Sequence, residues 1–141
     1  MMGAKAPHNL SIRIYYEDTD FSGVVYHASY LRFLERGRTE ILRDRGIDQA
    51  ALFGEGGAGA LSFAVRHMSI DWLKPARMDD MITVETRIGI IKGASLTLHQ
   101  RILRGDEILM TAEVLVALVA DGKPARISPD LRVKLQPNEG F

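Results

Sequence analysis

The chain has 141 residues and no cysteine, and its 18 basic residues balance 18 acidic ones. This length suits one domain, residues 1–141, which buries roughly 68% of its unfolded surface on folding. A net charge of zero provides no global field that would favour nucleic acid or an anionic membrane. The lack of cysteine excludes disulfides, thiolate metal sites and a cysteine nucleophile, and it fits a reducing compartment.

The first ten residues contain a lysine but no apolar segment of the kind that secretion signals carry. The longest apolar run, Val114 to Ala120, is far shorter than the roughly 20 residues that a membrane-spanning helix needs. We therefore expect a cytoplasmic protein without a transmembrane segment.

The chain is expected to begin with a strand that is followed by a long helix. Apolar residues alternate with others from Leu10 to Tyr16, which is the period of a half-buried strand. From Tyr26 onward, apolar or small residues fall within about 100° of arc on a helix. They are Tyr26, Tyr30, Phe33, Leu34, Gly37 and Ile41. A glycine inside a helix costs up to about 1 kcal/mol relative to alanine, so Gly37 predicts a close approach of the helix to a sheet.

Three signals predict the structure of the segment after the long helix. Gly46 is expected to end the helix as a cap. Asp48 is expected to cap a short second helix that reaches Phe53. The GEGGAG stretch that comes next lacks the Lys-Ser/Thr of a phosphate-binding loop and is interpreted as a flexible linker.

The remainder is expected to form strands. The apolar positions change register between Val65 and Met68, which predicts a β-bulge near Arg66 and His67. Residues 82–90 and 96–102 alternate with a period of two, and residues 108–120 are apolar on both faces in their second half. That last strand suits the centre of a sheet or a place under a subunit partner. A short terminal helix is expected to begin at Ser128 and Pro129.

One long helix against a curved antiparallel sheet of about five strands is an α+β layout. A single sheet of this kind leaves one face uncovered, and the long apolar last strand is expected to offer an edge. We therefore expect a homodimer with a continuous sheet, and an active site that lies between subunits.

Titratable residues concentrate where the first strand meets the long helix, in the string YYEDTDFSGVVYHASYLRFLERGRTE from Tyr15 to Glu40. Acyl transfer to water needs a nucleophile, or a base that delivers water, together with donors for the carbonyl oxygen. Asp20 precedes a turn at Gly23, and the helix start near Val25 to Ala28 presents free N–H groups. This joint is suited to acyl transfer, with Asp20 as nucleophile or as base.

The same string resembles the signature of the YbgC-like acyl-CoA thioesterases, within the 4-hydroxybenzoyl-CoA thioesterase group of hotdog-fold proteins. The strings WLKPARMDDMITVET, KGASLTLHQRI and AEVLVALV resemble later blocks of that family, so the resemblance runs roughly from Ile12 to Val119. It implies the hotdog fold, in which a curved antiparallel sheet wraps a long helix. It also implies hydrolysis of acyl-CoA or acyl-carrier-protein thioesters without a metal or redox cofactor, and dimers that pair into tetramers.

The resemblance also implies roles for individual residues. Asp20 matches the catalytic carboxylate, and His27 matches the position whose backbone N–H faces the thioester carbonyl, while its ring orients substrate or water. Tyr16 matches a position implicated in this subfamily as a hydroxyl donor near Asp20. Gly23 and Val25 are expected to contact substrate. Lys92, beside Gly93 in a turn between two strands, is expected either to meet CoA phosphates or to be a solvated turn residue.

The chain departs from the family pattern in two places. Phe21 and Ser22 stand where the family usually has a small residue followed by glycine, and the GEGGAG stretch lengthens the loop before the second strand. Neither departure is expected to touch the acid, but both bear on the acyl pocket, for which Phe21, Phe63 and Met68 are candidates. The acyl group, and the choice between CoA and a carrier protein, therefore stay open.

Other charged residues of the joint are expected to be structural. Asp18 is expected to cap the turn or to pair with an arginine such as Arg38. Glu35 and Arg38 are expected to form a pair on the helix surface without a chemical role. Asp18, Asp20 and His27 do not predict a metal site, because nothing supplies a fourth ligand.

Other functions compete with thioester hydrolysis. The first is a non-catalytic acyl-thioester binding or scaffold module, since relatives of this type are linked to the Tol–Pal envelope system and to phospholipid synthesis proteins. A serine hydrolase is not indicated, because the chain has no Gly-x-Ser-x-Gly elbow. Hotdog hydratases resemble this chain in fold only, and their Asp-x-Asn-Pro-x-His string is absent.

Overall fold

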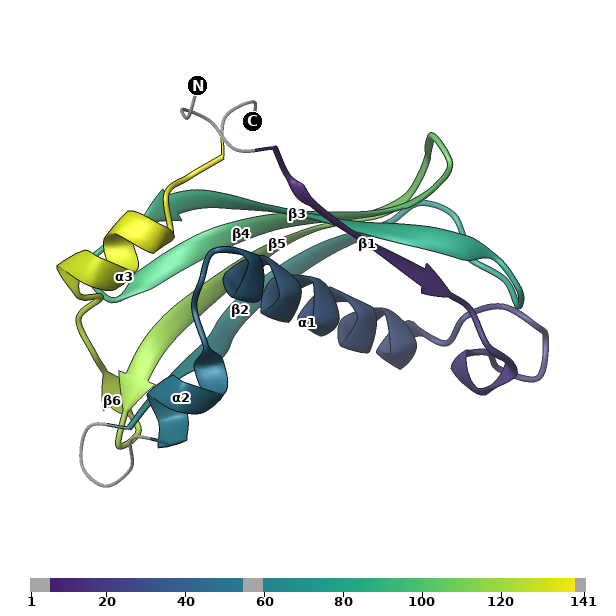
Figure 1. Cartoon of the computed structure of the whole chain (residues 1–141). Helices are drawn as coiled ribbons and strands as arrows, with labels where there is room; N and C mark the ends of the chain where they lie inside the picture. The colour runs from purple at the N-terminus through teal and green to yellow at the C-terminus, as the bar shows by residue number, and fades with distance from the viewer. Residues whose placement is uncertain (1–5, 55–59, 139–141) are drawn as a thin grey trace.

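The structure is a computed structural model and describes residues 6–54 and 60–138. Its sheet curls around the long helix α1, which lies in the concave side of the sheet (Figure 1). In chain order the elements are β1 (His8–Arg13), the 3₁₀ helix η1 (Tyr16–Asp18), α1 (His27–Asp44), α2 (Gln49–Gly54), β2 (Leu61–Trp72), β3 (Met81–Ile91), β4 (Ser95–Arg104), β5 (Glu107–Ala120), β6 (Lys123–Pro124) and α3 (Pro129–Lys134).

The strands pair antiparallel in the order β1-β3-β4-β5-β2, and the two-residue β6 pairs with the end of β5. This confirms the α+β layout and the central place of the long apolar strand β5. The expectation that β5 offers an edge is wrong, because β4 and β2 occupy both of its sides. The edges of the main sheet path are β1 and the 12-residue strand β2.

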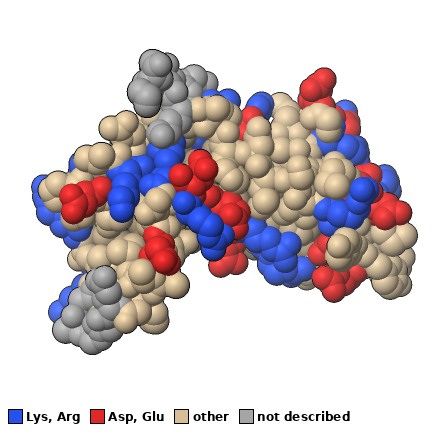
Figure 2. All heavy atoms as spheres, viewed as in Figure 1, with Lys and Arg blue, Asp and Glu red and all other residues tan. Residues whose placement is uncertain are grey.

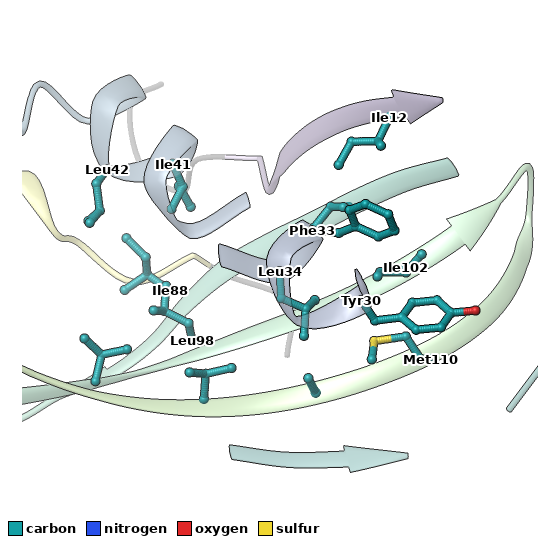
Figure 3. Close-up of a cluster of buried hydrophobic side chains, with 14 of the residues drawn as sticks. Ile12, Tyr30, Phe33, Leu34, Ile41, Leu42, Ile88, Leu98, Ile102 and Met110 are labelled. Atoms are coloured by element: carbon teal, nitrogen blue, oxygen red, sulfur yellow. The ribbon is translucent and has the colours of Figure 1, made fainter. Parts of the chain in front are cut away.

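The core lies between α1 and the concave face of the sheet (Figure 3). The helix contributes Tyr30, Phe33, Leu34, Ile41 and Leu42 to it, as its apolar spacing predicts. Tyr26 is the exception among the expected core positions, because it precedes the first helical residue as the N-cap and is 59% exposed.

Gly37 is the point where α1 comes closest to the sheet. A Cβ built there would lie 2.7 Å from Val84 Cγ1, 2.8 Å from Thr86 Oγ1 and 3.0 Å from Gln100 Nε2. The close approach expected from this glycine is confirmed. At the same place the buried Gln100 amide donates to the Leu34 carbonyl over 2.9 Å and to Thr86 Oγ1 over 3.0 Å.

Local signals in the sequence predicted most of the caps and the bulge. Gly46 ends α1 with a φ of +79°, and Asp48 Oδ1 accepts the Ala51 N–H at 3.1 Å at the start of α2. The register of β2 against β5 shifts between Val65 and His67, which confirms the bulge. Ser128 Oγ caps α3. In the predicted linker, residues 55–59 lie outside the described part of the chain.

The first strand ends earlier than its alternating pattern indicates. β1 stops at Arg13, and residues 16–18 form η1, so Tyr16 is not part of a half-buried strand. The buried Asp18 carboxylate accepts the Tyr15 N–H at 2.8 Å, and this side-chain bond favours a turn over continued strand pairing.

The two ends of the described chain meet beside β3 (Figure 1). Asn138, which is buried, accepts the Ile88 N–H at 2.7 Å and donates to the Ala6 carbonyl over 3.0 Å. One amide side chain therefore ties both ends of the described chain to the same region of the sheet.

On the face seen in Figure 2, basic and acidic side chains are intermingled rather than gathered into a field of one sign. This distribution agrees with the zero net charge of the chain. Within residues 6–54 and 60–138, no helix combines the length and the apolar character that crossing a membrane requires.

Candidate active site

Asp20 lies at the tip of a tight hairpin between η1 and α1. Thr19 and Val25 pair across this hairpin, and the Asp20 N–H donates to the Val24 carbonyl over 2.9 Å. Gly23 has a φ of +86° and donates to the Asp20 carbonyl over 3.1 Å. A positive φ strains a residue with a Cβ, which explains the glycine and confirms the sharp bend expected there.

The Asp20 carboxylate is held by Ser22. Asp20 Oδ1 accepts the Ser22 hydroxyl at 2.5 Å and the Ser22 backbone N–H at 2.8 Å. The hydroxyl first, and then the backbone N–H, lower the pKa of Asp20 below its usual value because they stabilise the ionised carboxylate. The expectation that the departure at Ser22 does not touch the acid is wrong. The second oxygen, Oδ2, has no hydrogen-bond partner within the described chain.

The start of α1 offers two backbone donors rather than four. The Val25 N–H is already bonded to the Ala76 carbonyl at 2.9 Å, and the Tyr26 N–H to the Asp18 carbonyl at 3.0 Å. Among the described residues, nothing accepts the N–H groups of His27 and Ala28, as is usual for the first turn of a helix. Of the backbone N–H groups expected to be free donors, from Val25 to Ala28, only those of His27 and Ala28 remain. Val25 is buried, and its bond to Ala76 holds the hairpin against the segment before β3.

An aromatic cluster fixes the helix start against the end of β2. The His27 and Trp72 rings lie 4.3 Å apart between centroids, and Tyr30 meets Trp72 edge to face at 5.2 Å. The Tyr30 hydroxyl accepts the Ala76 N–H at 2.8 Å. Sequence reasoning missed Trp72, because its partner His27 lies 45 positions earlier and no local pattern joins the two.

Two aromatic residues of the joint are more exposed than expected, whereas Asp18 is buried. Tyr16 is 78% exposed, and within the described chain no hydrogen bond joins its hydroxyl to Asp20. Phe21 extends fully into solvent at 103% exposure, so it does not line a pocket of its own chain. Asp18 pairs with Arg32 at 3.7 Å rather than with Arg38.

Lys92 lies at the opposite end of the sheet from Asp20. The hairpin that carries Asp20 contacts Ala76 and Arg77, just before β3 begins, whereas Lys92 follows the last residue of β3. Arg132 donates to the Lys92 carbonyl over 3.0 Å. One chain therefore does not bring Lys92 and Asp20 together.

A cavity of about 220 Å³ opens between α1 and the concave face of the sheet. Phe63 lines it as expected, together with Val65 on β2 and Leu98 on β4, but Met68 does not. The cavity also receives Arg38 from α1, whose guanidinium donates to Gln100 Oε1 over 3.1 Å. The expected surface pair of Arg38 with Glu35 is wrong, because Arg38 turns inward to a partner on β4.

Comparison with known proteins connects this site to a family. The profile of the Thioesterase-like superfamily matches residues 15–135. The acyl-CoA thioester hydrolase YbgC of Escherichia coli O6:H1 is 45% identical over 119 residues, which are 84% of each chain. The acyl-CoA thioesterase YbgC of Haemophilus influenzae is 43% identical over 123 residues, 87% of this chain and 88% of that one.

A solved structure agrees with these matches. The structure of a probable thioesterase from Bartonella henselae superimposes with a TM-score of 0.81 at 48% identity, over 87% of this chain and all of that one. The antiparallel sheet that curls around α1 is thus the hotdog fold that the sequence resemblance implies. Because the matched residues span the hairpin, α1 and the strands β2 to β5, this chain belongs to the Thioesterase-like superfamily.

Proposed function

We propose that this chain hydrolyses acyl-CoA thioesters, with Asp20 as the catalytic carboxylate. One observation carries the proposal: an ionised carboxylate with one free oxygen precedes a helix start whose His27 and Ala28 N–H groups have no acceptor within the described chain. YbgC relatives at 43–45% identity, named as acyl-CoA thioester hydrolases, support this substrate class.

In the proposed reaction, the thioester carbonyl oxygen accepts hydrogen bonds from the helix start, which stabilise the negative charge that develops on it. Asp20 Oδ2 either attacks the carbonyl carbon or removes a proton from a water that attacks it. A new C–O bond forms, the C–S bond breaks, and CoA leaves as a thiolate that then takes up a proton. Nucleophilic attack gives a mixed anhydride, which water cleaves to the free acid.

Neighbouring side chains have supporting roles in this proposal. The His27 ring, held against Trp72, borders the carbonyl position and orients substrate or water. Gly23 permits the bend that presents Asp20 to the substrate. Tyr16, exposed on η1, is the proposed hydroxyl donor toward the bound acyl group.

We further propose a homodimer that forms through the edge strand β2. An edge strand presents unpaired N–H and C=O groups, and Val65 and Trp72 are 46% and 44% exposed on β2. Antiparallel pairing of two β2 strands about a two-fold axis turns the second copy end for end. Its Lys92 then comes to the same end of the double sheet as Asp20 of the first copy, where it can meet CoA phosphates.

Asp20→Asn tests the catalytic assignment. We expect kcat for a short acyl-CoA to fall by about 10²- to 10⁴-fold, while affinity for the thioester persists, because asparagine keeps the shape but loses the charge. Free-thiol release measures turnover, and calorimetry measures binding. Glu17→Gln, a neighbouring acid on η1, serves as the matched control and should leave kcat unchanged. An Asp20→Asn protein with unchanged turnover would overturn the proposal, and a wild type that binds without turnover would indicate a binding module.

A further inference from the structure

Arg38 occupies an unusual position for an arginine on an amphipathic helix. It projects from α1 into the cavity beneath the helix, among Leu42, Leu98 and Val116. Loss of water around the guanidinium lowers the pKa of Arg38, and the nearby charge of Glu35 opposes that change. The cationic group therefore lies partly desolvated in a cavity whose wall combines apolar side chains with Glu35, Thr39 and Gln49.

The bonds that hold Arg38 leave most of its donors unused. Gln100 Nε2 donates to the Leu34 carbonyl and to Thr86 Oγ1, so the amide is fixed with Oε1 toward the helix. Arg38 Nη1 donates to that oxygen over 3.1 Å. A guanidinium has five N–H donors, and within the described residues Arg38 forms no ion pair. A partly desolvated, positioned cation that no carboxylate contacts directly within the described residues is favourable for an anionic ligand.

We propose that Arg38 is a specificity residue that binds a carboxylate at the far end of the acyl group. The planar fork of a guanidinium matches a carboxylate in a bidentate arrangement, which a neutral methyl end cannot use. The cavity of about 220 Å³ accepts a short chain or a ring, since roughly 150 Å³ suffices for a benzene molecule in a protein interior. The ligand class is a thioester of a short dicarboxylic acid.

The acyl group reaches Arg38 across the proposed dimer. Along one helix about 16 Å separates His27 from Arg38, at 1.5 Å per residue. The cavity is lined by Phe63 and Val65 in the first half of β2, whereas Trp72, which holds His27, ends that strand. Antiparallel pairing through β2 thus sets the cavity of one copy beside the helix start of the other. This inference rests on the proposed function.

Glu35 is the other charged residue that lines the cavity. It is exposed and forms no ion pair with Arg38 in the described structure, but its charge lies close enough to oppose a carboxylate ligand. Neutralising Glu35 should therefore increase the preference for an acyl group that ends in a carboxylate, whereas neutralising Arg38 should remove this preference. The two substitutions give opposite signs, which a general loss of folding cannot imitate.

The experiment compares adipoyl-CoA with hexanoyl-CoA, which have the same chain length and differ in the end group. For wild type we expect kcat/KM to favour adipoyl-CoA by at least about tenfold, as hydrogen bonds to a charged group allow. Arg38→Gln should abolish this ratio while hexanoyl-CoA turnover stays within about threefold of wild type. Arg38→Lys should restore part of the ratio, and Glu35→Gln should raise it. Arg43→Gln, an exposed arginine later on α1, is the matched control.

The same comparison can be made without turnover. In Asp20→Asn protein, calorimetry gives the affinities for adipoyl-CoA and hexanoyl-CoA, and their ratio should match the ratio of kcat/KM in wild type. The inference is overturned if wild type shows no preference for adipoyl-CoA over hexanoyl-CoA. It is also overturned if Arg38→Gln lowers kcat/KM equally for both substrates, as a purely structural role beside Gln100 would require. A wild type that hydrolyses neither substrate but keeps the affinity ratio would contradict the proposed function and leave the Arg38 assignment standing.

Discussion

Ser22 donates its hydroxyl to the Asp20 carboxylate over 2.5 Å, and its backbone N–H reaches the same oxygen over 2.8 Å. Both bonds favour the ionised form, so the pKa of Asp20 lies below its usual value. The residue two positions after the acid thus favours the charged form of the acid. Oδ2, the other oxygen, receives no hydrogen bond from the described residues.

Ser22→Ala removes the hydroxyl but keeps the backbone N–H. We expect the pKa of Asp20 to rise, and because the proposed mechanism uses the ionised carboxylate, the acid limb of the pH–rate profile should move to higher pH. Near pH 7 and above, roughly, Asp20 is ionised in both proteins and kcat should change little. Ser22→Thr keeps a hydroxyl, so the acid limb of its pH–rate profile should match that of wild type. Superimposable profiles for Ser22→Ala and wild type would exclude this role of Ser22.

Gly37→Ala should destabilise the protein by overpacking. The added Cβ would lie within 3.0 Å of three atoms on β3 and β4, which costs about 1 to 3 kcal/mol, while the better helix propensity of alanine returns at most about 1 kcal/mol. Urea unfolding measures the difference in free energy of unfolding. Gly54→Ala is the control, because a Cβ at Gly54 meets nothing within 4 Å. A Gly37→Ala protein more stable than wild type would refute the close contact.

Val65→Asp should separate the proposed dimer. Val65 is exposed on the edge strand β2, and a carboxylate there would place like charges near one another across a two-fold axis. Sedimentation should give wild type a mass of at least two 15.7 kDa chains and the variant a mass nearer one. Val133→Asp, on α3, should leave the mass unchanged. A wild type that sediments as a single chain would rule out the dimer, and a mass of four chains would indicate paired dimers.

Features that depend on neighbouring residues were predictable from the sequence. The helix α1, its glycine at the sheet contact, the caps at Asp48 and Ser128, and the bulge in β2 are all encoded in spacing within a few positions. The acid and the turn at Gly23 were found in the same way. The family resemblance then gave the fold, and the matched profile and relatives confirm it.

Features that depend on remote partners were not predictable. Arg38 turns inward because Gln100, 62 positions away, presents an oxygen to it. β5 is internal because β2, which lies far earlier in the chain, covers its second side. Tyr16 leaves the strand because Asp18 captures a backbone N–H, a competition that an alternating pattern does not reveal. For Arg38 and β5 a contact with a residue far along the chain decided the outcome, whereas for Tyr16 the competing side-chain bond spans only three positions.

The shared anchor of both chain ends at Asn138 has a practical consequence for engineering this protein. Because that amide holds Ala6 and Ile88 together, the described backbone is nearly a closed ring, and its ends lie at the opposite end of the sheet from the Asp20 hairpin. A circular permutation that joins the ends and opens the exposed turn at Gly122, which follows the end of β5 away from the Asp20 hairpin, would therefore leave the elements around that hairpin intact.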